Sequence, residues 1–235
     1  MLRAVASLVA PPLCALCGRP CDYPDSICRH CERKVAALRP SRSTLPGGLE
    51  VISAAPYEGI ARELVAKMKF ASRLTLAEVA AERMLRAWGA TREGWIVSVP
   101  PAPARERARG YDVAYVLARL MTHDTWAQVA PVLERDDGPR QVGRPREERM
   151  ADPPRVRLLS DKVVLPSESL WLLDDVVTTG ATLTACARVL KEAGATRVRA
   201  LTFARAQDQP PQQRRGSASS YRTPPHTLGP RALAA

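Results

Sequence analysis

Two adjacent carboxylates, Asp174 and Asp175, follow a short apolar run and constrain the fold more than any other feature of this chain. The apolar run at residues 170–173 predicts a buried strand, and residues 182–193 carry apolar side chains at helical spacing. A second apolar run follows at residues 198–203. This strand–turn–helix–strand order predicts a βαβ unit within a mainly parallel sheet.

The turn between this strand and its helix predicts a site for a phosphorylated sugar. Open α/β sheets bind ligands at the carboxyl ends of their strands. The free N–H groups and the dipole at a helix N-terminus favour a phosphate. Thr178, Thr179 and Thr182 can add hydroxyl donors, and the two aspartates can accept hydrogen bonds from ribose hydroxyls. The alternative is an ordinary strand–turn–helix, which does not require Asp-Asp, Thr-Thr-Gly and Thr in this order.

The rest of the predicted α/β domain, residues 50–206, alternates between helical and strand-like patterns. Residues 60–88 have the spacing of one or two amphipathic helices, and residues 95–99 form a short apolar run typical of a strand. Residues 111–122 predict another helix. Residues 136–154 are polar, charged and rich in Gly and Pro, which predicts a mobile surface loop.

The length of 235 residues suits one main core with accessories. Residues 207–235 are rich in Gln, Pro, Ser and Arg, so we expect a disordered tail and assign it no function. No apolar run approaches the roughly 18 to 20 residues that a membrane span needs. The apolar stretch at residues 4–10 imitates a signal core but is cut short by Pro11 and Pro12. We expect a cytoplasmic protein without membrane insertion.

Two Cys-x-x-Cys pairs stand within residues 1–40, separated by ten residues. Cys14 and Cys17 form the first pair, and Cys28 and Cys31 form the second. Each pair can present two thiolates to one tetrahedral Zn²⁺, and the four together leave no open position. We therefore expect a small module with a structural zinc ion. A disulfide framework is the alternative, and a reducing cytoplasm disfavours it.

Three further residues could be mistaken for parts of a metal site. Cys21 and His30 lie close enough in sequence to substitute as zinc ligands, but four paired cysteines make both redundant. Cys186 lies on the apolar side of the helix predicted at residues 182–193. We expect its thiol in the hydrophobic core.

The formal net charge of +11 indicates attraction to polyanions. A nucleic acid, a phosphorylated metabolite or an acidic protein would all satisfy it. All but five of the 35 basic residues are arginines, and arginine binds phosphate in a bidentate manner better than lysine does. A GC-rich genome accounts for the arginine excess equally well, so composition leaves the partner open.

Several basic residues could hold a diphosphate. Arg105, Arg107 and Arg109 follow the strand predicted at residues 95–99, and the loop at residues 136–154 could close over a ligand as a lid. This loop carries four arginines that could contact the diphosphate, namely Arg140, Arg144, Arg146 and Arg149. The alternative for each arginine, and for Lys69, is an ordinary solvated surface charge.

Residues 172–183 resemble the phosphoribosyl-diphosphate loop of type I phosphoribosyltransferases. The resemblance implies that family's fold, a parallel twisted sheet flanked by helices. It also implies catalytic roles for Asp174 and Asp175, which would contact the ribose 2′ and 3′ hydroxyls. The phosphate-binding residues that it implies are Val177, Thr178, Thr179, Gly180, Ala181 and Thr182.

A wider resemblance, to the ComF or GntX family of bacterial competence proteins, extends from the cysteine pairs to Arg205. Besides those pairs and the Asp-Asp loop, it rests on Lys69-Phe70, Val99-Pro100-Pro101, Arg109-Gly110-Tyr111, Gln141 and Arg149. Members are associated with DNA uptake or use and are predicted phosphoribosyltransferases. The family typically reads Phe-Asn-Gln after Arg-Gly, where this chain has Tyr111-Asp112-Val113, and it often has Asn where this chain has Asp152. Among the matched residues, Arg109 and Arg149 are expected to bind the ligand.

Three functions follow as expectations. The first is an active phosphoribosyltransferase that uses 5-phosphoribosyl 1-diphosphate with Mg²⁺, a nitrogen nucleophile attacking ribose C1 as diphosphate leaves. The second is a module that binds phosphoribosyl diphosphate or a related nucleotide without turnover. The third is an accessory protein that binds single-stranded DNA and works with the DNA-uptake machinery. No residue identifies the acceptor of the phosphoribosyl group.

Overall fold

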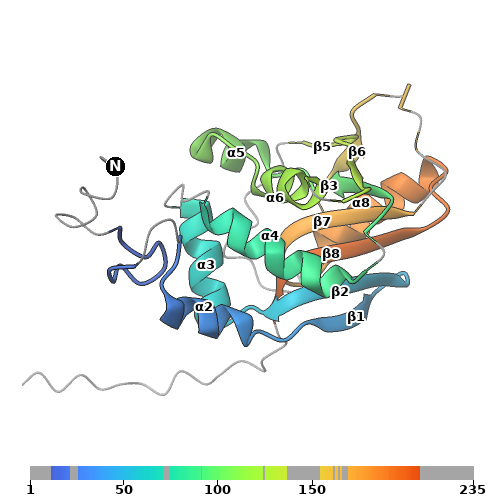
Figure 1. The fold of residues 1–235 in the computed structure, drawn as a ribbon. Helices are drawn as coiled ribbons and strands as arrows, with labels where there is room; N and C mark the ends of the chain where they lie inside the picture. Colours follow the sequence, from blue (N-terminus) through green and yellow to red (C-terminus); the bar gives the residue numbers. More distant parts are fainter. Residues whose placement is uncertain are drawn as a thin grey trace, which may run out of the picture.

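A six-stranded sheet lies between two layers of helices in the computed structural model (Figure 1). The structure describes residues 12–21, 26–70, 75–90, 92–123, 125–136, 154–160, 162–163, 165 and 169–206. The strands, in order across the sheet, are β1 (Ser41–Leu45), β2 (Leu49–Pro56), β8 (Val198–Arg205), β7 (Leu170–Val177), β3 (Trp95–Ser98) and β4 (Gln128–Val129). The β1–β2 pair is antiparallel and the other four pairs are parallel.

The helices and a second, two-stranded sheet complete the fold. The helices are α2 (Arg29–Ala36), α3 (Gly59–Phe70), α4 (Thr75–Trp88), α5 (Pro103–Arg109), α6 (Val113–Thr122) and α8 (Ala181–Glu192). The second sheet pairs β5 (Leu133–Arg135) with β6 (Val156–Leu158) in antiparallel register. The mixed α/β architecture predicted from the sequence is confirmed.

Strand β7 is apolar on both faces because it lies inside the sheet with helices on either side. Leu170 and Leu172 join one hydrophobic cluster, whereas Trp171 and Leu173 join the other. This alternation follows from the period of two residues in a strand. Helices α3, α4 and α6 pack on the face of Trp171, and α8 packs on the face of Leu172. Figure 1 shows α4 and α6 on one side of the sheet and α8 on the other.

The βαβ unit is confirmed, but its first strand is longer than expected. We predicted a turn from residue 174, and this boundary is wrong because β7 runs to Val177. Asp174 still pairs with Thr202 of β8, and Val177 pairs with Arg205. Backbone pairing with β8 therefore keeps both aspartates within the strand at its carboxyl end, despite their low β-propensity.

The other predicted elements agree with the structure apart from their ends. The pattern at residues 60–88 forms two helices, α3 and α4, and the helix expected from residue 111 begins at Val113, after its cap Asp112. The hairpin of β1 and β2, the short helix α5 and strands β4 to β6 were not predicted. Residues 137–153 of the expected loop and the expected tail at residues 207–235 lie outside the described residues.

The cysteine-rich segment packs on the main domain. Leu16, Ile27 and Val35 belong to the same hydrophobic cluster as Leu64 of α3 and Leu76 of α4. Helix α2, which follows the second cysteine pair, contacts α3 directly. The segment thus extends the helical layer on one face of the sheet. Within the described parts of the chain, no helix combines the length and apolarity that crossing a bilayer requires.

A buried hydrogen bond joins β2 to β8 beside the strand that carries the aspartates. The hydroxyls of Ser53 and Thr202 lie 2.8 Å apart, and both side chains are fully buried. We predict that Thr202→Val lowers the free energy of unfolding by about 1–3 kcal/mol, because it leaves the Ser53 hydroxyl without its partner. In urea unfolding, adding Ser53→Ala to that variant should cost little more. Additive costs of the two changes would contradict a coupled pair.

Candidate functional site

The carboxyl ends of β3 and β7 mark a point where the chain reverses direction across the sheet. After β3 the next strand of the sheet is β4, on the outer side, whereas β7 is followed by β8 on the opposite side. Connections that diverge in this way leave a crevice beyond the strand ends, and open α/β folds bind ligands there. The sequence pattern predicted a site at the end of β7, and the topology places a crevice there.

A cavity of about 270 Å³ occupies this crevice. We call it the switch pocket. Its lining includes seven residues of the predicted site, namely Arg109, Asp174, Asp175, Thr178, Thr179, Ala181 and Thr182. The pocket thus joins the carboxyl end of β7, the first turn of α8 and the last turn of α5. Arg149, also predicted to bind ligand, lies outside the described residues.

Two predicted residues support the loop from outside the pocket wall. The Val177 side chain is buried in the cluster beneath α8. Gly180 adopts φ of +80° immediately before α8, a conformation that L side chains rarely adopt. A Cβ at this position would lie 2.5 Å from Cδ1 of Leu45. Glycine is therefore required here by both backbone conformation and packing against β1.

Hydrogen bonds within the loop and at the start of α8 order this turn. The Thr179 hydroxyl accepts a hydrogen bond of 3.3 Å from the Ala181 N–H, and the Thr184 N–H donates to the Gly180 carbonyl at 2.8 Å. Ala181 and Thr182 open α8, so the positive end of the helix dipole faces the pocket. An anionic group is favoured at this wall.

Asp175 is a buried carboxylate with a cationic partner. Its side chain is 9% exposed, and its Oδ2 lies 2.6 Å from Nζ of Lys69, at the end of α3. Because Asp175 is two residues beyond Leu173, it emerges on the face covered by α3, α4 and α6. The ion pair neutralises the carboxylate in a location where an unpaired charge would be costly.

Asp174 lies in a different electrostatic environment. It emerges on the opposite face of β7, where Arg135 and Cys186 are near enough to act on its charge. Its Oδ1 accepts the N–H of Asp175 at 2.8 Å. Burial and the neighbouring Asp175 carboxylate raise the pKa of Asp174 well above its ordinary value, against the opposing effect of Lys69.

A third carboxylate, Asp112, lines the pocket at the start of α6. It caps this helix, and its Oδ1 accepts the N–H of Tyr115 at 3.2 Å. Burial raises the pKa of Asp112 to about 6, although hydrogen bonds from the backbone N–H groups of Tyr115 and Ala114 lower it. Asp175 also raises it, which shows that the two carboxylates face each other's field.

Basic side chains line the pocket from three elements. Arg105 and Arg109 come from α5, Lys69 from α3 and Arg135 from β5. Burial lowers the pKa of Arg135, and the nearby charge of Arg105 lowers it further. Four cationic side chains against three carboxylates, one with a strongly raised pKa, give the pocket a positive balance. This balance suits a ligand with several negative charges.

Sequence reasoning missed part of this site. Asp112 stands before a helical pattern in the position of an N-cap, a signal that predicts the cap but not its place in a pocket. Arg135 lies 39 residues before Asp174 in the sequence, on a strand too short to be recognised. We had considered Lys69 mainly as a surface charge, yet it is largely buried against Asp175.

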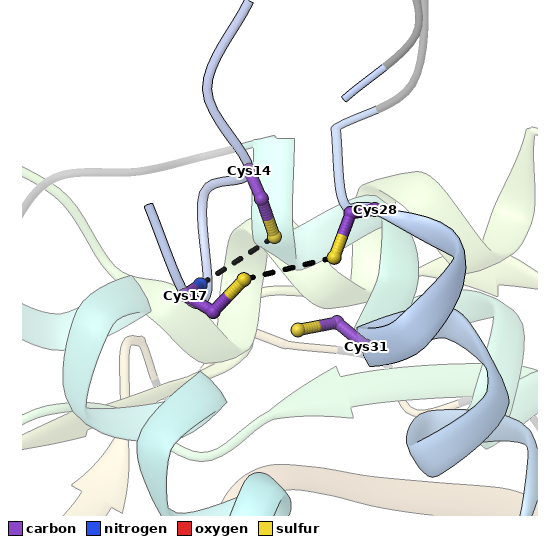
Figure 2. A group of neighbouring side chains, drawn as sticks. All are labelled: Cys14, Cys17, Cys28 and Cys31. Atoms are coloured by element: carbon purple, nitrogen blue, oxygen red, sulfur yellow. Dashed lines mark hydrogen bonds between the residues drawn. The ribbon is translucent and has the colours of Figure 1, made fainter. Parts of the chain in front are cut away.

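The second candidate site is the cysteine cluster at the N-terminal end of the described chain. Figure 2 shows the sulfurs of Cys14, Cys17, Cys28 and Cys31 directed toward one another. The four Sγ atoms all lie within 4.8 Å of each other, and those of Cys17 and Cys28 are 3.6 Å apart. With Zn–S bonds of about 2.3 Å, a tetrahedral site places its sulfurs about 3.8 Å apart. The cluster therefore has the donor set and the spacing for one zinc ion.

Backbone N–H groups favour thiolates in this cluster. Burial alone would raise the pKa of Cys14, but hydrogen bonds from the N–H groups of Cys17 and Cys28 outweigh it and lower the pKa to about 6. The N–H of Cys31 likewise lowers the pKa of Cys28. Burial instead raises the pKa of Cys31. A metal ion would remove this conflict because it binds the deprotonated form of every ligand.

The fifth cysteine of the segment lies outside the cluster. The Cys21 thiol donates to the Pro12 carbonyl at 3.4 Å, and the sequence had likewise indicated that it is redundant as a ligand. Cys186 is fully buried in the cluster beneath α8, as its place on the apolar helix face predicted.

Comparisons with known proteins find two similar proteins that are named for DNA utilization. It is 28% identical to the DNA utilization protein YhgH of Salmonella typhi over 207 residues, which cover 83% of this chain and 84% of that protein. The protein of the same name in Salmonella typhimurium strain LT2 matches to the same extent. No family model matches the chain.

A comparison with solved structures finds a likeness to orotate phosphoribosyltransferase from Aeropyrum pernix. The match has a TM-score of 0.34 and 16% sequence identity, and it covers 74% of this chain and 90% of that one. The chain is therefore similar over most of its length to two proteins named for DNA utilization. The geometry of the switch pocket, not the likeness to that enzyme, supports the proposal that follows.

The cysteine cluster generates a prediction about metal content. Protein purified from zinc-replete cells should contain about one Zn²⁺ per chain, because the four sulfurs provide a complete tetrahedral site. Combining Cys14→Ser with Cys17→Ser should abolish zinc binding, as measured by elemental analysis. Cys21→Ser is the matched control and should retain the metal. Full zinc content in the double variant would show that the ion is held elsewhere.

The raised pKa of Asp174 predicts a change of stability with pH. A carboxyl with a higher pKa in the folded than in the unfolded state destabilises the fold progressively as pH rises from about 4 toward its folded pKa. Asp174→Asn removes this effect and keeps the acceptor for the Asp175 N–H. The variant should therefore melt above wild type at pH 8, by about 2–4 °C for each kcal/mol gained.

The difference between the two proteins should vanish near pH 3, where wild-type Asp174 is protonated in both states. Asp175→Asn is the informative comparison, since it breaks the ion pair with Lys69 and should lower the melting temperature at neutral pH. A variant Asp174→Asn that melts below wild type at pH 8 would contradict the assigned direction of the pKa.

Proposed function

We propose that the chain is a phosphoribosyltransferase-like protein of bacterial DNA utilization that binds 5-phosphoribosyl 1-diphosphate in the switch pocket. The observation that carries this proposal is the convergence on one cavity of a carboxylate pair, a Thr/Gly loop at a helix N-terminus and four cationic side chains. These three parts match the three parts of the ligand: vicinal hydroxyls, a 5′-phosphate and a diphosphate.

Each part of the ligand has a complementary wall. The 5′-phosphate is assigned to the loop of Thr178 to Thr182, where hydroxyls and the start of α8 provide donors. The ribose hydroxyls are assigned to Asp174 and Asp175, whose oxygens accept hydrogen bonds. The diphosphate is assigned to the arginine side of the pocket, formed by Arg105, Arg109 and Arg135.

This arrangement supports transfer at ribose C1 by positioning and charge. As the bond from C1 to the diphosphate oxygen breaks and a nitrogen–C1 bond forms, negative charge grows on the leaving group and positive charge grows on the ribose ring. The arginines would stabilise the negative charge on the diphosphate, and the carboxylates would stabilise the positive charge on the ribose ring. Carboxylate oxygens are also ligands that Mg²⁺ accepts. Asp174 and Asp175 are the residues that would hold Mg²⁺ in this pocket, and the ion would offset part of the charge of the diphosphate.

A second candidate function is binding of single-stranded DNA. The relatives are named for DNA utilization, and the net charge of +11 favours polyanions. Binding of this kind should weaken steeply with salt, because each phosphate contact releases counterions. The two functions are compatible, since DNA could bind on a surface away from the switch pocket. No binding at about 50 mM salt would exclude the DNA function.

The loop hydroxyls provide the sharpest test of phosphoribosyl-diphosphate binding. Thr182→Val keeps the side-chain shape and removes one donor to the 5′-phosphate. We predict that it weakens binding of phosphoribosyl diphosphate with Mg²⁺ by about tenfold or more in calorimetry, the usual effect of losing a hydrogen bond to a charged group. Ribose 5-phosphate should bind the wild type at the same loop and lose affinity in parallel.

Thr184→Val is the matched control, because Thr184 lies two residues after Thr182 in α8 and does not line the switch pocket. Its affinity should equal that of wild type. Gly180→Val is a poorer test, since the clash with Leu45 would disturb folding as well as binding. If Thr182→Val and wild type bind both ligands equally, the loop is not the phosphate site.

A further inference from the structure

The ion pair between Lys69 and Asp175 places a lysine inside the switch pocket. Its ammonium group lies 2.6 Å from the carboxylate, and the lysine side chain is only 20% exposed. Both residues line the cavity. Since the pair is mostly shielded from solvent, it is held more firmly than a surface ion pair, which contributes little.

Tyr111 fixes the segment that carries this lysine. Its hydroxyl donates a hydrogen bond to the carbonyl of Met68, the residue just before Lys69. The Met68 side chain is fully buried in the hydrophobic core. Core packing and the hydrogen bond from Tyr111 therefore both fix the last turn of α3. Tyr111 itself stands between α5 and α6, next to Asp112. One hydroxyl therefore ties the lysine wall of the pocket to the wall that carries Arg109 and Asp112.

The position of Lys69 gives its ammonium group access to two anionic partners, the Asp175 carboxylate and the phosphates of a bound ligand. In the structure, Asp175 Oδ2 is the partner of its ammonium group. A ribose hydroxyl that donates to Asp175 would compete for this oxygen, while the phosphates of the same ligand would bring a new anion into the cavity. A lysine ammonium is a compact charge on a flexible stem, so it can turn from one anion to the other without movement of the helix.

We infer that Lys69 is a ligand-binding residue of the switch pocket and that Tyr111 positions it. Lys69 neutralises the charge of Asp175 through their ion pair. When phosphoribosyl diphosphate binds, the ligand hydroxyls take over the carboxylate and the ammonium group bonds to phosphate oxygen. The second stage rests on the proposed function, whereas the first stage concerns the free protein alone.

The free protein can be tested by nitrogen-15 NMR of lysine ammonium groups. The chain has five lysines, Lys34, Lys67, Lys69, Lys162 and Lys191, so the spectrum is simple. Lys69 should give a slowly exchanging signal that Lys69→Met removes and Lys67→Met, in the same helix, retains. Tyr111→Phe keeps the ring but should broaden or erase that signal. Tyr115→Phe, which changes a tyrosine on the exposed part of α6, is the matched control and should leave it unchanged.

The second stage is tested by calorimetry with phosphoribosyl diphosphate and Mg²⁺. Lys69→Met should weaken binding by about tenfold to a hundredfold, and Tyr111→Phe by about twofold to tenfold. Lys67→Met should bind like wild type. In wild type, addition of the ligand should shift the Lys69 signal, and a thermal melt of each variant confirms that it is folded.

The outcomes separate this inference from the proposed function. Folded Lys69→Met that binds as tightly as wild type would overturn the role of Lys69 and leave the proposed function standing. A Lys69 signal that is unaltered in Tyr111→Phe would overturn the role of Tyr111. Wild type that fails to bind the ligand would overturn both the proposed function and the second stage, while the NMR result on the free protein would still decide the first.

Discussion

The burial of β7 on both faces is the constraint on which the site depends. Leu172 needs α8 above it and Trp171 needs α4 and α6 below it, so the strand is stable only inside a three-layer fold. The carboxyl end of such a strand lies where both helical layers meet the edge of the sheet. Because successive side chains alternate between faces, two adjacent aspartates at this end receive different neighbours. Asp174 lies on the side of Arg135, and Asp175 lies on the side of Lys69.

This difference in neighbours separates the two carboxylates chemically. Asp175 has a cation at hydrogen-bond distance, whereas Asp174 lies beside a like charge and has a raised pKa. Holding Asp174 in this state costs stability at neutral pH. Sites that bind charged ligands commonly carry such a cost, since the ligand supplies the missing interactions. The energetic asymmetry therefore supports a binding role for this edge of the sheet independently of any resemblance to other proteins.

The sequence predicted the local parts of this arrangement well, because they depend on neighbours in the chain. The βαβ unit, the turn before α8 and the paired cysteines are set by short-range patterns, and the structure contains all three. The end of β7 was predicted too early, since its last residues are ordered by pairing with β8 and not by their own propensity. Arg135 could not be predicted, because its place in the pocket depends on the packing of the β5–β6 pair. The ion pair of Lys69 could not be predicted either, because it depends on where the end of α3 contacts β7. The assignment of all the predicted site residues to ligand binding stays a prediction, and Val177, Gly180 and Arg149 are the ones that do not line the described part of the pocket.

Helix α3 links the cysteine cluster to the switch pocket. On one side it packs against α2, whose Cys31 belongs to the cluster, and Val35 of α2 shares the hydrophobic cluster of Leu64. At its end it presents Lys69 to Asp175. A zinc ion bound by the four cysteines would therefore also stabilise the helix that forms one pocket wall. Such an ion would contribute to the site by fixing the position of α3, although it would lie outside the chemistry of the pocket. The small module and the α/β domain then act as one folded unit.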